Sequence, residues 1–311
     1  MRIVPAALLC LLLLTGCGVG TAPQTSLRLL VTEDFGTVPV QELDTPKSAA
    51  SDTVMRLLQR NTTVETRFGG GFVQSIDGRA GGREDGRPYD WFYYVNGVQA
   101  EEGATSVKVR PSDRIWWDRH DWGATSEIPA VVGSFPEPFV HGYDGSRLPT
   151  RLECTEPRSP QCVAVGKRMA EVGVVAGKGG LQTSLSRNTF RVVAGLYSAI
   201  RADEAVRNLE NGPKASGVYA KPAADGKSIA VLDPRGRTVR TLGPGSGLIA
   251  ATSFEDGRPL WIVTGTDEAG VLAAAEALRE GNLLGHFALG IADGQAVDVP
   301  LVPRSVPAPG A

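Results

Sequence analysis

Short apolar runs separated by turn-forming residues dominate residues 27–122. Residues 27–32 alternate apolar and polar side chains, which is the period of a β-strand. Similar runs, bounded by Gly, Asn, Asp or Pro, predict further short strands at residues 64–68, 72–76, 91–95, 107–109 and 114–117. This part of the chain is therefore predicted to consist mainly of strands.

One helix and one tight hairpin are predicted among these strands. Apolar residues recur at helical spacing over residues 54–58, and either Ser51 or Asp52 can cap a helix that ends near Asn61. Asn96-Gly97 is a hairpin signal, because both residues tolerate a positive φ. A strand followed by a helix and several short strands predicts a small α+β domain of the grasp-like kind.

Residues 126–302 mix strands and helices in a different order. Apolar runs predict strands at residues 128–132, 190–196, 228–232, 238–242, 248–252, 260–264 and 287–291. Amphipathic or capped segments predict helices at residues 161–173, 203–209 and 269–279. We therefore expect an α+β protein in which a small grasp-like β domain with one helix precedes an α/β sandwich domain, with a Pro-rich tail at residues 303–311.

Two glycine-rich turns in this second half resemble anion-binding loops. Gly265-Thr266-Asp267 lies at a strand-to-helix turn, where free backbone N–H groups can receive an anion. The turn over residues 243–247 leads into another predicted strand and lacks the helix that a phosphate-binding loop requires. We interpret both segments as turns.

The first residues have the layout of a lipoprotein signal peptide. Arg2 precedes the apolar run 6–14, and small residues stand directly before Cys17. The run is too short to span a bilayer, which takes roughly 20 apolar residues. We expect residues 1–16 to be removed, Cys17 to be lipidated and residues 17–26 to form a flexible tether. The protein is then anchored to the cell membrane and faces outside the cytoplasm.

Cysteine usage and charge narrow the class of protein further. Cys154 and Cys162 form one pair, which favours a disulfide in an oxidising compartment. Metal binding by two thiols needs further Cys or His ligands, and none lies nearby in the sequence. Lys and Arg number 32 against 34 Asp and Glu, for a formal net charge of −2. This balance gives no electrostatic reason to expect nucleic acid as a partner.

One predicted strand carries aromatic side chains on both of its faces. Trp91 and Tyr93 point to one face, while Phe92 and Tyr94 point to the other. One face must be core, and the other is an exposed aromatic platform unless the second half covers it. Two interpretations stay open: packing in the core and between the halves, or contact with a corrin, a sugar ring or a partner protein.

Several stretches of the first half carry a family resemblance. They cover residues 70–78, 91–97, 103–104 and 112–115. Together they resemble the transcobalamin carboxy-terminal-like domain family, in which this domain is the lid over cobalamin. The resemblance implies that Phe72, Gln74, Ser75 and Trp91 lie near a ligand, and Tyr93 follows on the same strand. The helical domain that forms the other wall in transcobalamin has no counterpart in this sequence, and Phe72 stands where the family has a tyrosine.

No motif in the sequence supports a catalytic reaction. Nucleophile elbows, zinc-protease helices and kinase signatures are absent. Asp118-Arg119-His120-Asp121 clusters metal-ligand types, but adjacent residues on a strand or loop point in different directions. We therefore expect a protein that is not an enzyme and that requires neither a metal nor a cofactor.

These observations lead to a functional hypothesis and an alternative. We expect a lipid-anchored binding protein that captures a small molecule, cobalamin or another corrinoid, and presents it to an uptake permease. The alternative is an adhesion module of the cell envelope, in which the aromatic strand docks a protein or a glycan. Titration with cobalamin discriminates the two.

Overall fold

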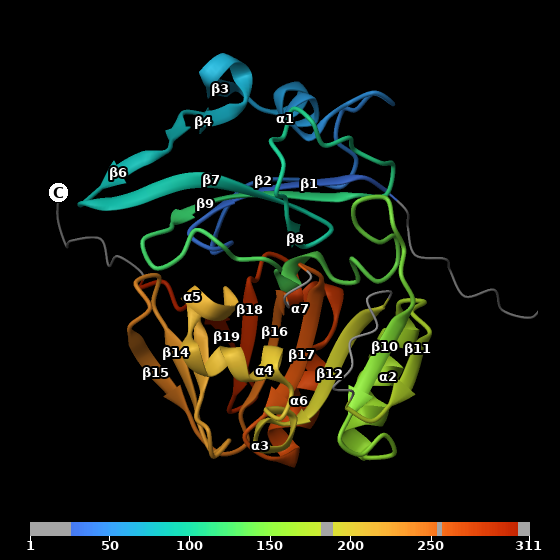
Figure 1. Ribbon diagram of the computed structural model, residues 1–311. Coiled ribbons are helices and arrows are strands. Elements are labelled where there is room, and N and C mark those ends of the chain that lie inside the picture. Colours follow the sequence, from blue (N-terminus) through green and yellow to red (C-terminus); the bar gives the residue numbers. More distant parts are fainter. Residues whose placement is uncertain (1–25, 182–188, 254–256, 304–311) are drawn as a thin grey trace, which may run out of the picture.

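The computed structural model describes residues 26–181, 189–253 and 257–303. It combines helices with several β-sheets, which confirms the α+β class predicted from the sequence. Among the described helices, none is long and apolar enough to cross a membrane. The expected signal peptide, the lipidation site Cys17 and most of the tether lie outside the described residues. In Figure 1 the first half of the chain forms a layer above the second half.

A six-stranded sheet is the main element of the first half. Its strand order is β2-β1-β9-β7-β6, and β8 pairs with β7. The strands are β1 (Arg28–Glu33), β2 (Val38–Leu43), β6 (Gly82–Glu84), β7 (Arg87–Val95), β8 (Val98–Gln99) and β9 (Arg114–Asp121). β1 and β9 are parallel, whereas the other pairs are antiparallel. The predicted Asn96-Gly97 turn joins β7 to β8, and both of its residues have a positive φ.

Helix α1 (Val54–Asn61) provides apolar side chains to the core of the first half. Its buried residues are Val54, Met55, Leu57 and Leu58. The cap is Thr53, whose hydroxyl accepts a hydrogen bond from the Arg56 N–H at 3.3 Å. The expected cap at Ser51 or Asp52 was therefore wrong, although the helix itself was predicted.

A small three-stranded sheet follows α1 in the chain and lies at the top of Figure 1. It consists of β3 (Val64–Arg67), β4 (Phe72–Ile76) and β5 (Arg79–Ala80), and the single turn η1 (Phe68–Gly70) joins β3 to β4. The strand expected at residues 107–109 is not formed. Lys108 instead makes a single bridge to Thr53, which ties this loop to the start of α1.

A seven-stranded sheet organises the second half. Its strand order is β11-β10-β12-β17-β16-β18-β19. The strands are β10 (Thr150–Cys154), β11 (Ala176–Gly179), β12 (Phe190–Leu196), β16 (Gly247–Ser253), β17 (Pro259–Gly265), β18 (Ala288–Ala292) and β19 (Gln295–Val299). The first four strands in this order are mutually parallel, and the last three join antiparallel.

Both faces of this sheet are covered, which gives the predicted sandwich. One face packs against α2 (Pro160–Glu171) and α6 (Glu268–Ala277). The other face is covered by α3 (Tyr197–Ile200), α4 (Glu204–Arg207), η3 (Asn208–Asn211), α5 (Pro213–Ser216) and the sheet of β13 (Ala220–Pro222), β14 (Ile229–Leu232) and β15 (Thr238–Leu242). Cys154 at the end of β10 and Cys162 in α2 form a disulfide with a Cα–Cα distance of 6.2 Å.

The segment that links the halves differs from the prediction. Residues 128–132 do not form a strand. Ala130 makes one bridge to Val98, and the turn η2 (Val132–Ser134) follows. The backbone groups of this segment bond to both halves, because Val131 N donates to Gly97 O and Val132 N donates to Phe287 O. The linker is thus part of the joint between the two layers.

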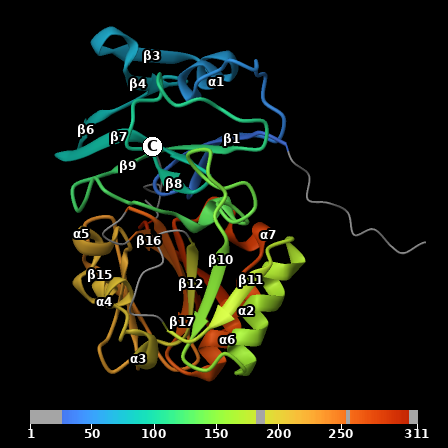
Figure 2. The ribbon, with the colours of Figure 1, turned by 45° about the vertical axis from the view of Figure 1, so that its right-hand side comes forward.

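The two halves share one hydrophobic core. Phe35, Tyr94 and Trp116 of the first half pack in the same buried cluster as Tyr219 and Phe287 of the second. The turned view of Figure 2 shows the same stacking of one layer on the other. Close approach also explains one glycine, since a Cβ on Gly36 would lie 1.7 Å from the Gly285 carbonyl oxygen. The halves are therefore held in one fixed arrangement by packing.

Candidate functional site

The five residues expected near a ligand do not share one surface. Ser75, Trp91 and Tyr93 are buried in the core of the first half, Gln74 is half-buried and Phe72 is exposed. The buried polar groups are already bonded. The Trp91 indole N–H donates to the Arg79 carbonyl at 2.9 Å, and the Tyr93 hydroxyl donates to the Glu102 carbonyl at 2.5 Å. These two side chains can reach a ligand only if this core opens.

Strand β7 has no exposed aromatic platform. Trp91 and Tyr93 belong to the core beneath α1, where Tyr93 stacks on Trp117 with ring centroids 4.8 Å apart. Phe92 and Tyr94 pack in the core that the halves share. Of the two interpretations that the sequence left open for this strand, the structure therefore shows core packing on one face and packing between the halves on the other.

An exposed aromatic pair lies instead on the turn between β3 and β4. We call residues 68–72 the aromatic hairpin. Phe68 is 87% exposed and Phe72 is 36% exposed, and their rings meet edge to face with centroids 6.2 Å apart. Phe68 has a φ of 53°, and Gly69 and Gly70 follow with positive φ values. A bulky residue in this region of φ is uncommon and costs conformational energy. The turn thus holds a large apolar ring out in solvent.

Only part of the aromatic hairpin was predicted from the sequence. Within the hairpin, Phe72 was a candidate through the family resemblance, whereas Phe68 was not. The signal for Phe68 was present, because three glycines separate it from Phe72 and a glycine run of this kind predicts a tight turn with open space around it. A Cβ on Gly69 or Gly70 would meet no atom within 4 Å.

The Asp118-Arg119-His120-Asp121 run lies in β9 and has a structural role. Asp118 and His120 are fully buried and point toward the second half, and His120 Nδ1 lies 2.8 Å from Asp118 Oδ1. Arg119 bonds elsewhere, to the Ala80 carbonyl at 2.7 Å. Across the described residues, no group of three or more His, Cys, Asp or Glu side chains is arranged to hold a metal ion.

The Asp118 carboxylate fixes the turn between β1 and β2. It accepts hydrogen bonds from the Thr32 hydroxyl, from the Phe35 N–H at 3.1 Å and from the Gly36 N–H at 2.9 Å. Phe35 has a φ of 60°, and its ring packs between His120 and Phe287 at centroid distances of 4.5 and 5.2 Å. The carboxylate therefore holds a strained aromatic side chain in the core shared by the halves.

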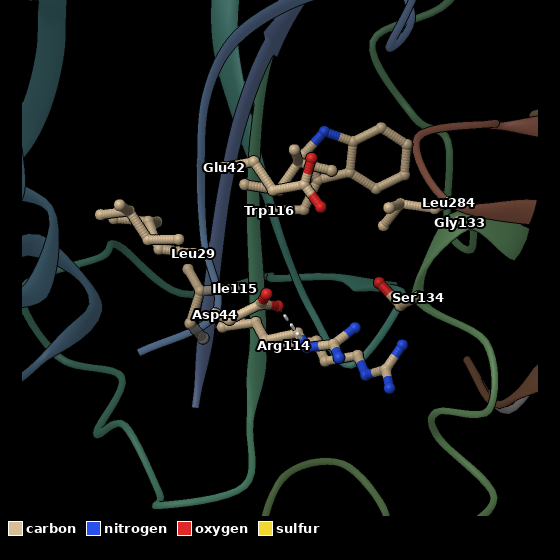
Figure 3. A pocket seen from close by; sticks show the side chains of 12 residues that line it. Leu29, Glu42, Asp44, Arg114, Ile115, Trp116, Gly133, Ser134 and Leu284 are labelled. Atoms are coloured by element: carbon tan, nitrogen blue, oxygen red, sulfur yellow. Dashed lines mark ion pairs between the residues drawn. The ribbon is translucent and has the colours of Figure 1, made fainter. Parts of the chain in front are cut away.

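A small pocket opens at the edge of the joint between the halves (Figure 3). Its cavity volume is only about 30 Å³, far below the volume of a site for a drug-sized ligand. Two guanidinium groups lie in it. Arg28 pairs with Asp44 at 3.0 Å, and Arg114 pairs with Glu280 at 3.0 Å. Burial lowers the pKa of Arg114.

The charged side chains of this pocket form ion pairs between the two halves. Glu280 lies in α7 (Glu280–Leu283) of the second half, and both Arg28 and Arg114 of the first half reach it. Arg114 also donates to the Phe135 carbonyl at 2.6 Å. Since carboxylates already face both guanidiniums, we interpret the pocket as part of the joint.

The Gly265-Thr266-Asp267 segment is a capped turn, in agreement with our interpretation. Asp267 accepts hydrogen bonds from the Gly270 N–H at 2.9 Å and from the Gly245 N–H at 2.6 Å. Its own carboxylate thus occupies the amino terminus of α6, where an anion would bind. The same side chain joins the two glycine-rich turns of the second half.

Comparison with known proteins finds a matching family for only part of the first half. Residues 51–121 match a domain of unknown function, DUF4430. No curated protein matches the chain. A solved structure described as a "putative metal binding protein" from Ruminococcus gnavus ATCC 29149 is 17% identical, with a TM-score of 0.25. The likeness covers 32% of this chain and 98% of that one. The chain is thus similar to the DUF4430 family over residues 51–121, which include α1, the aromatic hairpin, β7 and β9.

Proposed function

We propose that the protein is a lipid-anchored binding protein outside the cytoplasmic membrane, without catalytic activity, and that its aromatic hairpin captures a small molecule with a flat apolar face. The anchor is proposed from the signal pattern that ends at Cys17. The binding surface is proposed from the exposure of Phe68 and Phe72. This assignment replaces Trp91 and Tyr93 as ligand contacts, because both are buried.

The exposed aromatic pair is the observation that carries the proposal. Burying a Phe side chain contributes about 1.5–3 kcal/mol of stabilisation, so an exposed ring lacks this stabilisation in the free protein. The positive φ of Phe68 adds a conformational cost. A feature that costs stability in two ways is typical of a binding surface. Two rings that meet edge to face offer a ligand one ring face and one ring edge.

A corrinoid is the first candidate ligand. Its conjugated ring is flat and apolar on its faces, and the resemblance of the first half to transcobalamin lids points to this class. Phe72 and the half-buried Gln74 lie on the same strand, β4, so an amide accompanies the aromatic pair. The proposal includes an uptake permease as the partner that receives the ligand. A tether at Cys17 raises the local concentration of the captured molecule near such a permease.

One observation favours the alternative, docking to a protein or glycan of the cell envelope. The aromatic hairpin lies at the end of the first half that is remote from the second half, and the described pocket lies elsewhere, at the joint. A projecting hairpin suits a partner that brings its own concave surface. In this reading the same two rings insert into a pocket of the partner.

Calorimetric titration distinguishes the two functions. The soluble chain from Gly18 onward is titrated with cobalamin and with its precursor cobinamide. We expect saturable binding that Phe68→Ser and Phe72→Ser each weaken about tenfold or more, because each removes a ring worth about 1.5–3 kcal/mol of contact. Val175→Ser is the matched control, since Val175 is 91% exposed in the second half. Absence of heat with both corrinoids contradicts capture and favours envelope docking.

A further inference from the structure

A cluster of aromatic rings fills the centre of the joint between the halves. Phe287 of the second half lies between Tyr94 and His120 of the first, at centroid distances of 5.6 and 5.4 Å. Tyr219 of the second half rests on Phe35 of the first at 5.1 Å. All five side chains are buried, so the cluster has no direct path to solvent.

Three polar atoms of this cluster have no hydrogen-bond partner among the described residues. They are the hydroxyl oxygens of Tyr94 and Tyr219 and the Nε2 atom of His120. The two hydroxyls come from opposite halves of the molecule. Buried polar groups in folded proteins are nearly always bonded, to protein or to ordered water. Three unbonded groups within one ring cluster therefore indicate a partner of another kind.

The surroundings of these groups indicate which of them donate hydrogen bonds. Burial raises the pKa of Tyr94 and of Tyr219, so both hydroxyls keep their protons and can donate. His120 Nδ1 faces the Asp118 carboxylate, which can only accept, so Nδ1 carries the hydrogen. In the neutral imidazole, Nε2 is then the acceptor. The site thus presents two donors and one acceptor.

We propose that this cluster encloses a binding site for water at the joint between the halves. Water accepts hydrogen bonds from the hydroxyls of Tyr94 and Tyr219 and donates to Nε2 of His120, through one molecule or a short chain of molecules. A buried water typically makes two to four such bonds, so one molecule or a short chain is enough to satisfy the three unpartnered groups. The ligand is water rather than a solute, because the surrounding side chains are closed to solvent and pack ring against ring.

The enclosed water completes a network that crosses the joint. In the first half, the Trp116 indole N–H donates to the Thr32 hydroxyl at 2.7 Å, and that hydroxyl donates to Asp118. His120 donates to the same carboxylate, and the water extends the network from His120 to Tyr219. The two halves are then joined by polar bonds inside their shared core as well as by apolar packing. This role goes beyond ligand capture and does not depend on it.

Removing one hydroxyl at a time tests the proposal by the sign of its effect on Tm. We expect Tyr94→Phe and Tyr219→Phe each to lower the Tm of the full chain in detergent by about 2–4 °C, as for a lost hydrogen bond. If the hydroxyls were dry and unbonded, their removal would relieve a buried polar group and raise Tm. A rise or no change in either variant overturns the proposal.

A control and a direct measurement complete the test. Tyr197→Phe is the matched control, because the Tyr197 hydroxyl is bonded to Glu210 at 3.0 Å and its loss must lower Tm if the assay is sensitive. A high-resolution crystal structure should show a density peak within about 2.7–3.2 Å of His120 Nε2 or of a tyrosine hydroxyl. An empty site in that density also overturns the proposal. Neither readout involves a corrinoid, so failure here leaves the ligand-capture test unaffected.

Discussion

Asp118→Asn tests whether one buried carboxylate holds the strained turn of the first half against the second. The carboxylate accepts from four donors, which are the Thr32 hydroxyl, the N–H groups of Phe35 and Gly36, and His120 Nδ1. Two donors face each oxygen. An asparagine amide keeps one oxygen and replaces the other with an NH₂ group, so two of the four donors lose their acceptor in either orientation.

The size of the effect follows from these bonds. A hydrogen bond to a charged group contributes about 1.5–3 kcal/mol, so two of them amount to about 3–6 kcal/mol. The neutral amide costs less to bury than the carboxylate, which offsets part of this loss. We therefore expect Asp118→Asn to lower the free energy of unfolding by about 3 kcal/mol. This is a large share of the roughly 5–15 kcal/mol that stabilises a typical protein.

Guanidinium unfolding followed by tryptophan fluorescence measures this change, since Trp116 lies in the same buried network. The matched control is Asp293→Asn, because Asp293 is an exposed turn residue with a φ of 52° that asparagine adopts readily. We expect the control to change stability by less than about 0.5 kcal/mol. A loss below about 1 kcal/mol for Asp118→Asn would refute the reasoning, because the turn would then be held without the carboxylate.

Two further predictions concern acid stability and the membrane anchor. The Arg60 side chain donates to Asp52 and holds the pKa of Asp52 below its ordinary value of 3.8. The stability that this pair contributes is therefore present above pH 3.8 and is lost as the pH falls through the lower folded pKa. We expect the Tm gap between the native protein and Asp52→Asn to narrow from about pH 6 to about pH 3, and a constant gap would contradict this. We also expect Cys17→Ala to release the protein from membranes, because two or three acyl chains hold a protein stably and none remain. Continued sedimentation of this variant with membranes would refute the lipid anchor.

Local sequence signals predicted those turns and helices whose conformation is set by residues close together in the chain. Asn96-Gly97 formed its hairpin because both residues adopt a positive φ at little cost. The helix α6 was predicted, and Asp267 caps it through a bond to Gly270 only three residues away. The strands β2, β10, β11 and β19 and the short strands β5, β6 and β13 were not predicted. β2 is an exposed edge strand that contains Pro39, and β11 is half glycine, so neither shows a buried apolar pattern.

The candidate site was harder to predict because burial depends on distant parts of the chain. Trp91 and Tyr93 look the same in sequence whether they face solvent or a core, and their burial follows from packing with α1 and Trp117. The alternation of β9 does place Asp118 and His120 on one face. Their partner Phe35 lies over 80 residues away in the chain, and no local pattern reveals that contact.

Hydrogen exchange of the soluble protein, with and without saturating cobinamide, tests the central claim most directly. The claim is that the aromatic hairpin, rather than strand β7, is the binding surface. We predict that cobinamide slows exchange of the backbone amides of residues 67–74 and leaves those of β7 unchanged, since β7 is already buried and paired on both sides. Unchanged exchange at residues 67–74, or protection confined to β7, would contradict the account.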